Sequence, residues 1–383
     1  MIKKASLIVL VFCLLLAILS PALVQAQGGL AIVDSSAEAD FPARLNFNLS
    51  ARSNVNITDI RLCYTVDRAS FAEVISEVYI EFAPSTTVDV SWSLEMVKIA
   101  PGLPPGSTAE YWWRVKDASG SKVETAPVQV RFDDTRYQWR NLTEGKVTVY
   151  WYKGDDSFAQ ELMAAAQQAL ENLAADTGAE LEKPIGLYIY ADANDLRGAM
   201  IYPQEWTGGV AFTGYGIMAI GIAPGDIDWG KTAIVHELTH LVIDQMTFNP
   251  YTGLPTWLDE GLAMYSEGLL GPEFTTYLSR AVAKNSLISV QSLSSPFSAY
   301  GEGAYLSYAE SYSLVEFLIT NYGRDKMLEL LSTFRQGSSY DGALEKVYGF
   351  DMDGLDRLWR DYVTKQYRSA AELVPLVLVT AGF

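Results

Sequence analysis

The stretch "TAIVHELTHLVIDQ", residues 232–245, contains both histidines of this 383-residue chain. His236 and His240 lie four residues apart, with Glu237 directly after the first, in the pattern H-E-x-x-H. Positions i and i+4 share one face of a helix, so both imidazoles can reach one metal ion while Glu237 reaches a water beside it. The pattern predicts a zinc site on a helix, and such a site needs a third protein ligand from elsewhere in the chain.

The same stretch is apolar on its other faces, which predicts a buried helix. Hydrophobic side chains fill most of its remaining positions, namely Ile234, Val235, Leu238, Leu241, Val242 and Ile243. A glutamate within a buried helix is destabilising unless a charged group lies beside it, so the position of Glu237 favours a metal. The alternative is a buried helix whose two histidines only make hydrogen bonds.

A second motif, "PTWLDEGLAMYSEG" at residues 255–268, has helical periodicity from Pro255 onward. H-E-L-T-H (236–240), followed after nineteen intervening residues by Glu260 within W-L-D-E-G-L-A-M-Y (257–265), resembles the gluzincin zinc metallopeptidases. These form the grouping of thermolysin and aminopeptidase N, and the secreted peptidase MA-like family is the nearest likeness, over roughly residues 145–367. The resemblance implies that Glu260 is the third ligand, that the cofactor is Zn²⁺ and that the substrate is a peptide or protein.

A third segment, "YAESYSLVEFL" (308–318), is similar to the tyrosine and apolar helix of aminopeptidase N relatives. By that resemblance Tyr308 donates its hydroxyl to the oxyanion that develops during hydrolysis. Tyr305 and Tyr312 lie one helical turn to either side, so which of the three faces the zinc stays open. The alternative that all three are packing aromatics stays open as well.

Zinc-ligating histidines usually donate their second ring N–H to an acceptor. Three carboxylates stand at suitable positions: Asp244 follows His240 by one turn, Asp259 adjoins Glu260, and Glu267 shares the face of Glu260 two turns on. Each of them by itself is better accounted for as a solvated carboxylate. Together they predict at least one such acceptor.

Aminopeptidase N relatives carry a G-x-M-E-N stretch before the zinc helix, and its glutamate holds the free amine of the substrate. The corresponding place here, "WTGGVAF" (206–212), contains no acid. The resemblance implies that Gly208, Gly209, Val210 and Ala211 form an edge strand that pairs with an extended substrate. The missing acid favours an endopeptidase over a strict aminopeptidase.

The fold class expected is α+β. Apolar residues alternate with polar ones through residues 30–132, with turn residues between the runs, which predicts an antiparallel β-sandwich of the immunoglobulin or fibronectin type. Beyond Trp229 nearly every segment has helical periodicity, as in the C-terminal half of a zincin-type peptidase domain. The expected domains are the β-sandwich at 28–134, the metallopeptidase domain at 135–370 and a short apolar tail at 371–383.

The N-terminus has the layout of a secretory signal peptide, with Lys3 and Lys4, an apolar run from Leu7 to Leu19 and a small-residue site ending at Ala26. Cleavage after residue 26 predicts a secreted protein with no stable membrane span. An uncleaved segment would instead anchor the protein at the cell surface. Cleavage removes two lysines and no acid, so the mature chain is more acidic than the −18 of the full sequence. Such a charge excludes nucleic acid as a partner.

These features predict a secreted zinc-dependent endopeptidase in which a metal-activated water attacks the peptide bond and Glu237 acts as general base. Protonation of the histidines below about pH 6 should release the metal. The alternative is a catalytically silent zinc-site protein that acts as an extracellular binding or adhesion module.

Overall fold

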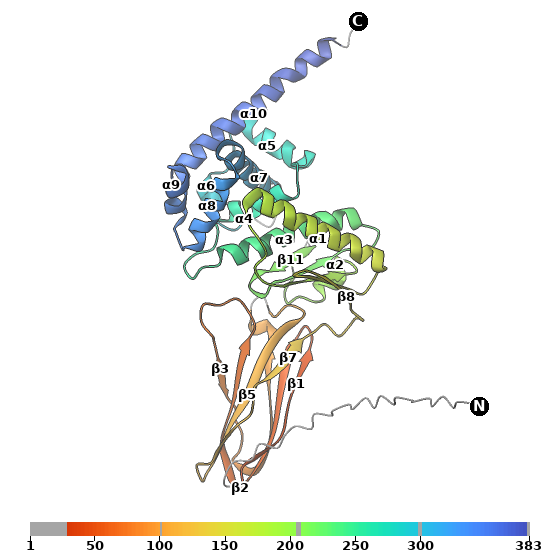
Figure 1. Cartoon of the computed structure of the whole chain (residues 1–383), viewed down its shortest axis with the longest axis vertical. Coiled ribbons are helices and arrows are strands. Elements are labelled where there is room, and N and C mark those ends of the chain that lie inside the picture. The colour runs from red at the N-terminus through yellow and green to blue at the C-terminus, as the bar shows by residue number, and fades with distance from the viewer. Residues whose placement is uncertain (1–28, 100–101, 204–207, 298–300, 381–383) are drawn as a thin grey trace, which may run out of the picture.

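The computed structural model describes residues 29–99, 102–203, 208–297 and 301–380 (Figure 1). The predicted signal peptide at 1–26 lies outside the described residues, as do Trp206 and Thr207 of the predicted edge segment. Among the helices of the described ranges, none combines the length and the apolar character that crossing a membrane requires. The architecture is α+β, with an antiparallel sheet followed by a second sheet and a largely helical C-terminal half.

The first sheet, called here the N-terminal sheet, is antiparallel throughout. Its strands are β1 (Ala31–Asp40), β2 (Arg44–Val66), β3 (Ser76–Tyr79), β4 (Ser85–Glu95), β5 (Ser107–Asp117), β6 (Lys122–Glu124) and β7 (Val128–Phe132), with the 3-10 turn η1 (Met96–Lys98) after β4. The strand β2 is 23 residues long and changes partners along its length. Residues 44–52 pair with β1 and β4, whereas residues 57–66 pair with β5 and, near their end, β3.

The predicted antiparallel strands are therefore present, but a two-sheet sandwich of the immunoglobulin or fibronectin type is not confirmed. Because β2 bonds to partners on both edges along both of its halves, all seven strands belong to one hydrogen-bonded sheet. Alternation along each strand indicates which residues are buried, and it carries no information on which strands pair.

The second sheet has the order β11-β12-β10-β9-β8. Its strands are β8 (Arg140–Glu144), β9 (Val147–Trp151), β10 (Ile185–Tyr190), β11 (Gly209–Phe212) and β12 (Ile217–Gly221). The three central strands are parallel, and β8 and β11 are antiparallel edge strands. Parallel neighbours need a crossover, and α1 (Asp156–Thr177) supplies it between β9 and β10. The carboxylate of Asp155 caps α1, and Gly178 ends it in the left-handed conformation.

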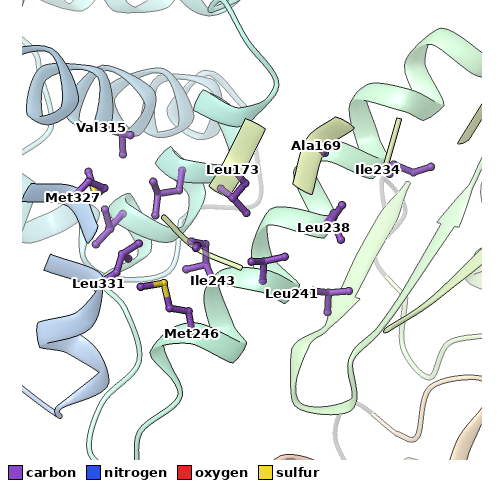
Figure 2. Close-up of a cluster of buried hydrophobic side chains, with 14 of the residues drawn as sticks. Ala169, Leu173, Ile234, Leu238, Leu241, Ile243, Met246, Val315, Met327 and Leu331 are labelled. Atoms are coloured by element: carbon purple, nitrogen blue, oxygen red, sulfur yellow. The ribbon is translucent and has the colours of Figure 1, made fainter. Parts of the chain in front are cut away.

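The two faces of the second sheet belong to two different cores. On one face, Leu187 and Ile189 pack with α1 and with α3 (Ile227–Thr247). Figure 2 shows the side chains of this cluster from α1 (Ala169, Leu173), from α3 (Ile234, Leu238, Leu241, Ile243, Met246) and from the later helices (Val315, Met327, Leu331). On the opposite face, Tyr188 and Tyr190 are buried in a cluster that includes Phe132 and other residues of the N-terminal sheet. The two sheets thus share a continuous core.

The remaining helices are α2 (Ala193–Arg197), the 3-10 turn η2 (Thr213–Tyr215), α4 (Thr256–Ser266), α5 (Pro272–Lys284), α6 (Val290–Leu293), α7 (Glu302–Tyr322), α8 (Arg324–Arg335), α9 (Tyr340–Tyr348) and α10 (Met352–Thr380). The backbone of α10 continues through most of the expected tail at 371–383. Helices α4 and α7 approach very closely at Gly261, where an added Cβ would lie 2.4 Å from the carbonyl oxygen of Ser311. This approach brings together the two helices that carry Glu260 and Tyr308.

Candidate metal centre

Helices α3 and α4 meet at the three predicted metal ligands. The regular helix at 227–247 places His236 and His240 one turn apart, with their Nε2 atoms 3.5 Å and 3.6 Å from Oε2 of Glu260. One ligand atom from each of the three residues lies within 4.8 Å of the other two. The spacing of nineteen residues between His240 and Glu260 accommodates the turn from α3 back into α4.

The chemistry of this group fits a zinc ion. Ligand atoms 2.0–2.2 Å from a tetrahedral zinc lie about 3.3–3.5 Å apart, which matches the two separations to Glu260 and exceeds an ordinary hydrogen bond. Oε2 of Glu260 is buried and has no hydrogen-bond partner among the described residues. A buried carboxylate oxygen in that position is unfavourable, and a cation between the three side chains removes the penalty. The side chains remain 20%, 12% and 21% exposed for His236, His240 and Glu260, so solvent can reach the site.

Two carboxylates contact the outer nitrogens of the histidines. Nδ1 of His236 lies 2.6 Å from Oε1 of Glu267, and Nδ1 of His240 lies 3.1 Å from Oδ1 of Asp259, the latter outside hydrogen-bond geometry. Such contacts fix the rings with their Nε2 atoms directed at a common point. The third predicted acceptor, Asp244, makes no hydrogen bond or ion pair with either histidine among the described residues, and its side chain interacts with that of Thr213.

In the metal-free chain these carboxylates strongly favour protonated histidines. Burial by itself lowers the pKa of His236, but interactions with Glu260 and Glu267 outweigh it and raise that pKa to about 9. Burial likewise lowers the pKa of His240, and Asp259 and Glu260 together raise it well above its ordinary value. Burial raises the pKa of Glu260, yet the two histidines bring it down to about 2. Protons therefore compete with zinc well above the value of about pH 6 that ordinary imidazoles suggest.

A pH dependence of zinc binding follows from the raised histidine pKa values. Below about pH 9 a proton on His236 must leave before the nitrogen can ligate, so zinc affinity should fall as the pH is lowered from 9 to 6. The expected slope is about tenfold per pH unit for each proton displaced. Competition with a chromophoric chelator across this range measures it, with the pH dependence of the chelator itself as the control. A flat affinity between pH 6 and 9 would contradict the assignment.

Glu237 lies against the edge strand β11. A Cβ at Gly209 would be only 2.9 Å from Oε1 of Glu237, so the carboxylate occupies space that a larger residue there would need. Burial raises the pKa of Glu237, while the two histidines and a backbone hydrogen bond from Ala211 act in the opposite direction. The Gly-Gly pair before an apolar run is the sequence signal for this close approach.

The predicted substrate-strand residues lie on β11 or just before it. Val210 pairs with Ala219 of β12, and the carbonyl of Gly208 accepts from the backbone N–H of Gly221. As β11 is the last strand in the sheet order, its second edge pairs with no other strand of the described chain. An unpaired edge beside a buried glutamate is suited to an extended peptide.

Of the three tyrosines on α7, Tyr308 is the one near the site. Burial raises its pKa, and the negative charges of Glu260 and Glu237 raise it further, which places its hydroxyl within electrostatic reach of both. Tyr305 is 41% exposed and stacks on Tyr277, with ring centroids 5.3 Å apart. Tyr312 is buried beside Tyr265.

Two histidines, a glutamate from a second helix and a half-buried glutamate beside them define the site of a zinc-dependent hydrolase. A model of the peptidase MA superfamily matches residues 165–365, more than half of the chain, and the chain belongs to that superfamily. The protein is accordingly a zinc metallopeptidase, and its cofactor is Zn²⁺.

Solved structures with distant similarity are also metallopeptidases. An M1 zinc metallopeptidase from Deinococcus radiodurans is 12% identical over 88% of this chain and 95% of its own, with a TM-score of 0.36. A two-domain M1 zinc metallopeptidase mutant bound to L-arginine is 12% identical over 89% and 96%, with a TM-score of 0.40. Legionella pneumophila aminopeptidase A in complex with aspartic acid is 13% identical over 86% and 48%, with a TM-score of 0.41. No curated protein matches the chain.

Proposed function

We propose that this metallopeptidase is a secreted endopeptidase that cuts extended peptide chains. The observation that supports the reaction is the convergence of three elements: the His236, His240 and Glu260 group, the carboxylate of Glu237, and the open edge of β11. The first holds the metal, the second lies where a water is deprotonated, and the third aligns the peptide bond. We retain 28–134 and 135–370 as the proposed domains.

In the proposed mechanism His236, His240 and Glu260 hold the zinc. Bound zinc supplies Lewis acidity, which lowers the pKa of a water toward neutrality. Glu237 removes a proton from that water as its oxygen adds to the peptide carbonyl carbon, and Glu237 then delivers the proton to the nitrogen as the C–N bond breaks. Its buried carboxylate, beside Gly209 and Ala211, is positioned for both transfers.

We assign Tyr308 the role of donating a hydrogen bond to the carbonyl oxygen as negative charge develops on it. Its ring is held edge-on by Phe297 at 5.4 Å, and its raised pKa keeps the phenol protonated throughout the working pH range. Such a donor acts mainly in the transition state, so its loss should lower kcat more than it raises KM.

Tyr308→Phe is therefore expected to lower kcat about 10²- to 10³-fold with little change in KM or in zinc content. Tyr305→Phe, one turn away on the exposed side of α7, is the matched control and should behave as wild type. Steady-state kinetics on one peptide measures both. An equal loss in the two variants would assign Tyr308 a packing role.

The cleavage mode rests on the absence of an acidic residue at 208–212 next to Glu237. Without it, no carboxylate on the edge strand holds a free amine at the position adjoining the scissile bond. We therefore expect internal cleavage, and secretion of the protein if the signal at 1–26 is processed. Mass spectrometry of the N-terminus of protein secreted by the native host tests the latter, since a retained residue 1 would contradict it.

Metal removal tests the function as a whole. The zinc-loaded protein should release internal fragments from casein, dialysis against a chelator should abolish release, and added Zn²⁺ should restore it. Mass spectrometry of the fragments distinguishes internal cuts from stepwise removal of terminal residues. Zinc binding without hydrolysis of casein or of a peptide library would instead favour the binding-protein alternative.

A further inference from the structure

Beyond the zinc site, the end of β11 opens into a cavity of about 460 Å³. Its lining includes Thr213, Asp244 and Phe248, together with Asp67, Arg68 and Lys183. We propose that this cavity binds a positively charged group of the peptide substrate, with the carboxylate of Asp244 as its partner. The proposal deepens the peptidase function given above and rests on it.

Asp244 is a half-buried carboxylate without a cationic partner. Its side chain interacts with that of Thr213, the charges of Asp259 and His240 also act on it, and none of the described lysines or arginines forms a salt bridge with it. Burial of the side chain raises its pKa, and the interactions with Thr213 and His240 oppose that shift only in part. A cation in the cavity offsets that desolvation.

The other charged groups of the cavity are either paired with each other or exposed to solvent. Glu182 and Arg335 pair with each other at 2.7 Å, and both side chains are about half exposed. Asp67, Arg68 and Lys183 lie at the exposed rim, where solvent and salt screen their effect. Asp244, on the zinc helix, is half-buried, whereas the other two acids of the lining, Asp67 and Glu182, are exposed.

The position of Asp244 relative to the scissile bond follows from the geometry of α3 and β11. Glu237 and Asp244 are seven residues apart on α3, a rise of about 10 Å. Thr213, which contacts Asp244, comes directly after β11, whose Gly209 and Ala211 adjoin Glu237. A strand paired with β11 advances about 3.3 Å per residue, so the charged group lies about three residues from the bond that is cut.

A loop of the N-terminal sheet closes the far side of the cavity. The N–H of Ala69 donates to the carbonyl of Gly214 at 2.6 Å, and Phe71 stacks on Phe248 with ring centroids 4.1 Å apart and planes 9° apart. These contacts hold the loop at the edge of the cavity, where residues 67–69 form part of the lining. Two sources of the charge fit this geometry: the N-terminal ammonium of a peptide, or the side chain of a lysine or arginine.

The test measures binding separately from hydrolysis. Zinc-loaded full-length Glu237→Gln is titrated calorimetrically with otherwise neutral octapeptides: one with a free N-terminus, one acetylated, and acetylated versions with lysine or norleucine at successive positions. The titrations are repeated with Asp244→Asn added, which keeps an acceptor for Thr213. Asp228→Asn, on the exposed first turn of the same helix, is the control for charge alone.

We expect at least one cationic peptide to bind about tenfold or more tightly than its neutral counterpart, and Asp244→Asn but not Asp228→Asn to abolish the difference. Loss of the preference on acetylation identifies the terminal ammonium, and a preference for lysine identifies the side chain. Asp244→Glu should retain the contrast, which guards against misfolding as the cause.

Equal affinity for cationic and neutral peptides, persistence of the contrast in Asp244→Asn, or no binding of any peptide would overturn the proposal. Failure of the peptidase function is distinguishable, because wild-type protein that hydrolyses nothing can still show the binding contrast.

Discussion

Glu237→Gln is expected to bind about one zinc per chain and to hydrolyse peptides about 10²- to 10⁴-fold more slowly than wild type. The amide preserves the shape of the side chain against Gly209 but cannot accept a proton from water. Since Glu237 contributes no ligand atom to the group of His236, His240 and Glu260, the metal site should remain intact. Zinc content by atomic emission and kcat on a fluorogenic peptide measure the two properties together.

The informative result is the combination of full zinc with lost turnover. A variant that keeps wild-type activity would remove Glu237 from the mechanism and direct attention to another base. If zinc and activity are lost together, Glu237 supports the metal site. Glu161→Gln is a suitable control, because Glu161 is an exposed glutamate of α1 that pairs with Lys231 of α3.

The second large effect is expected on the affinity of the site for zinc. Glu260→Gln should weaken zinc binding by more than the 10- to 100-fold typical of losing an outer partner of a ligand, because it replaces a direct ligand and its charge. The two Nε2 atoms would then face a neutral amide in place of the carboxylate. Hydrolysis should fall in parallel and recover in part at high zinc concentration.

The control for Glu260→Gln is Glu273→Gln, at the exposed first turn of α5, which should retain zinc and activity. Circular dichroism and thermal unfolding of both variants separate metal loss from misfolding. Zinc content unchanged in Glu260→Gln would exclude this residue as a ligand, whatever the activity.

The metal group could be predicted from the sequence because its geometry is local. Helical periodicity fixes the relation of His236 to His240, and a characteristic motif with a single glutamate in the required place marks Glu260. The sequence could not predict in the same way which carboxylates contact the outer nitrogens of the two histidines. Asp244 satisfies the i+4 spacing as well as any candidate, yet its side chain interacts with Thr213, a residue of the 3-10 turn η2 that periodicity does not bring near.

The same limit applies to strand pairing and to α7. The strands β9 and β10 are recognisable as strands, but their parallel pairing depends on the crossover by α1 and not on their own residues. Three tyrosines at helical spacing look alike in sequence. Burial near Glu260 distinguishes Tyr308, whereas Tyr305 stacks on a ring of α5.

The shared core of the two sheets has a consequence for how this enzyme can be divided or evolve. Because Tyr188 and Tyr190 of the second sheet are interior residues only while the N-terminal sheet covers them, removal of that sheet would expose both side chains to solvent. Separation of the halves would leave a contiguous apolar face on each, a surface that promotes aggregation. Substitutions on one side of the contact between the two sheets must therefore be matched on the other side, so the shared core constrains the sequences of both proposed domains together.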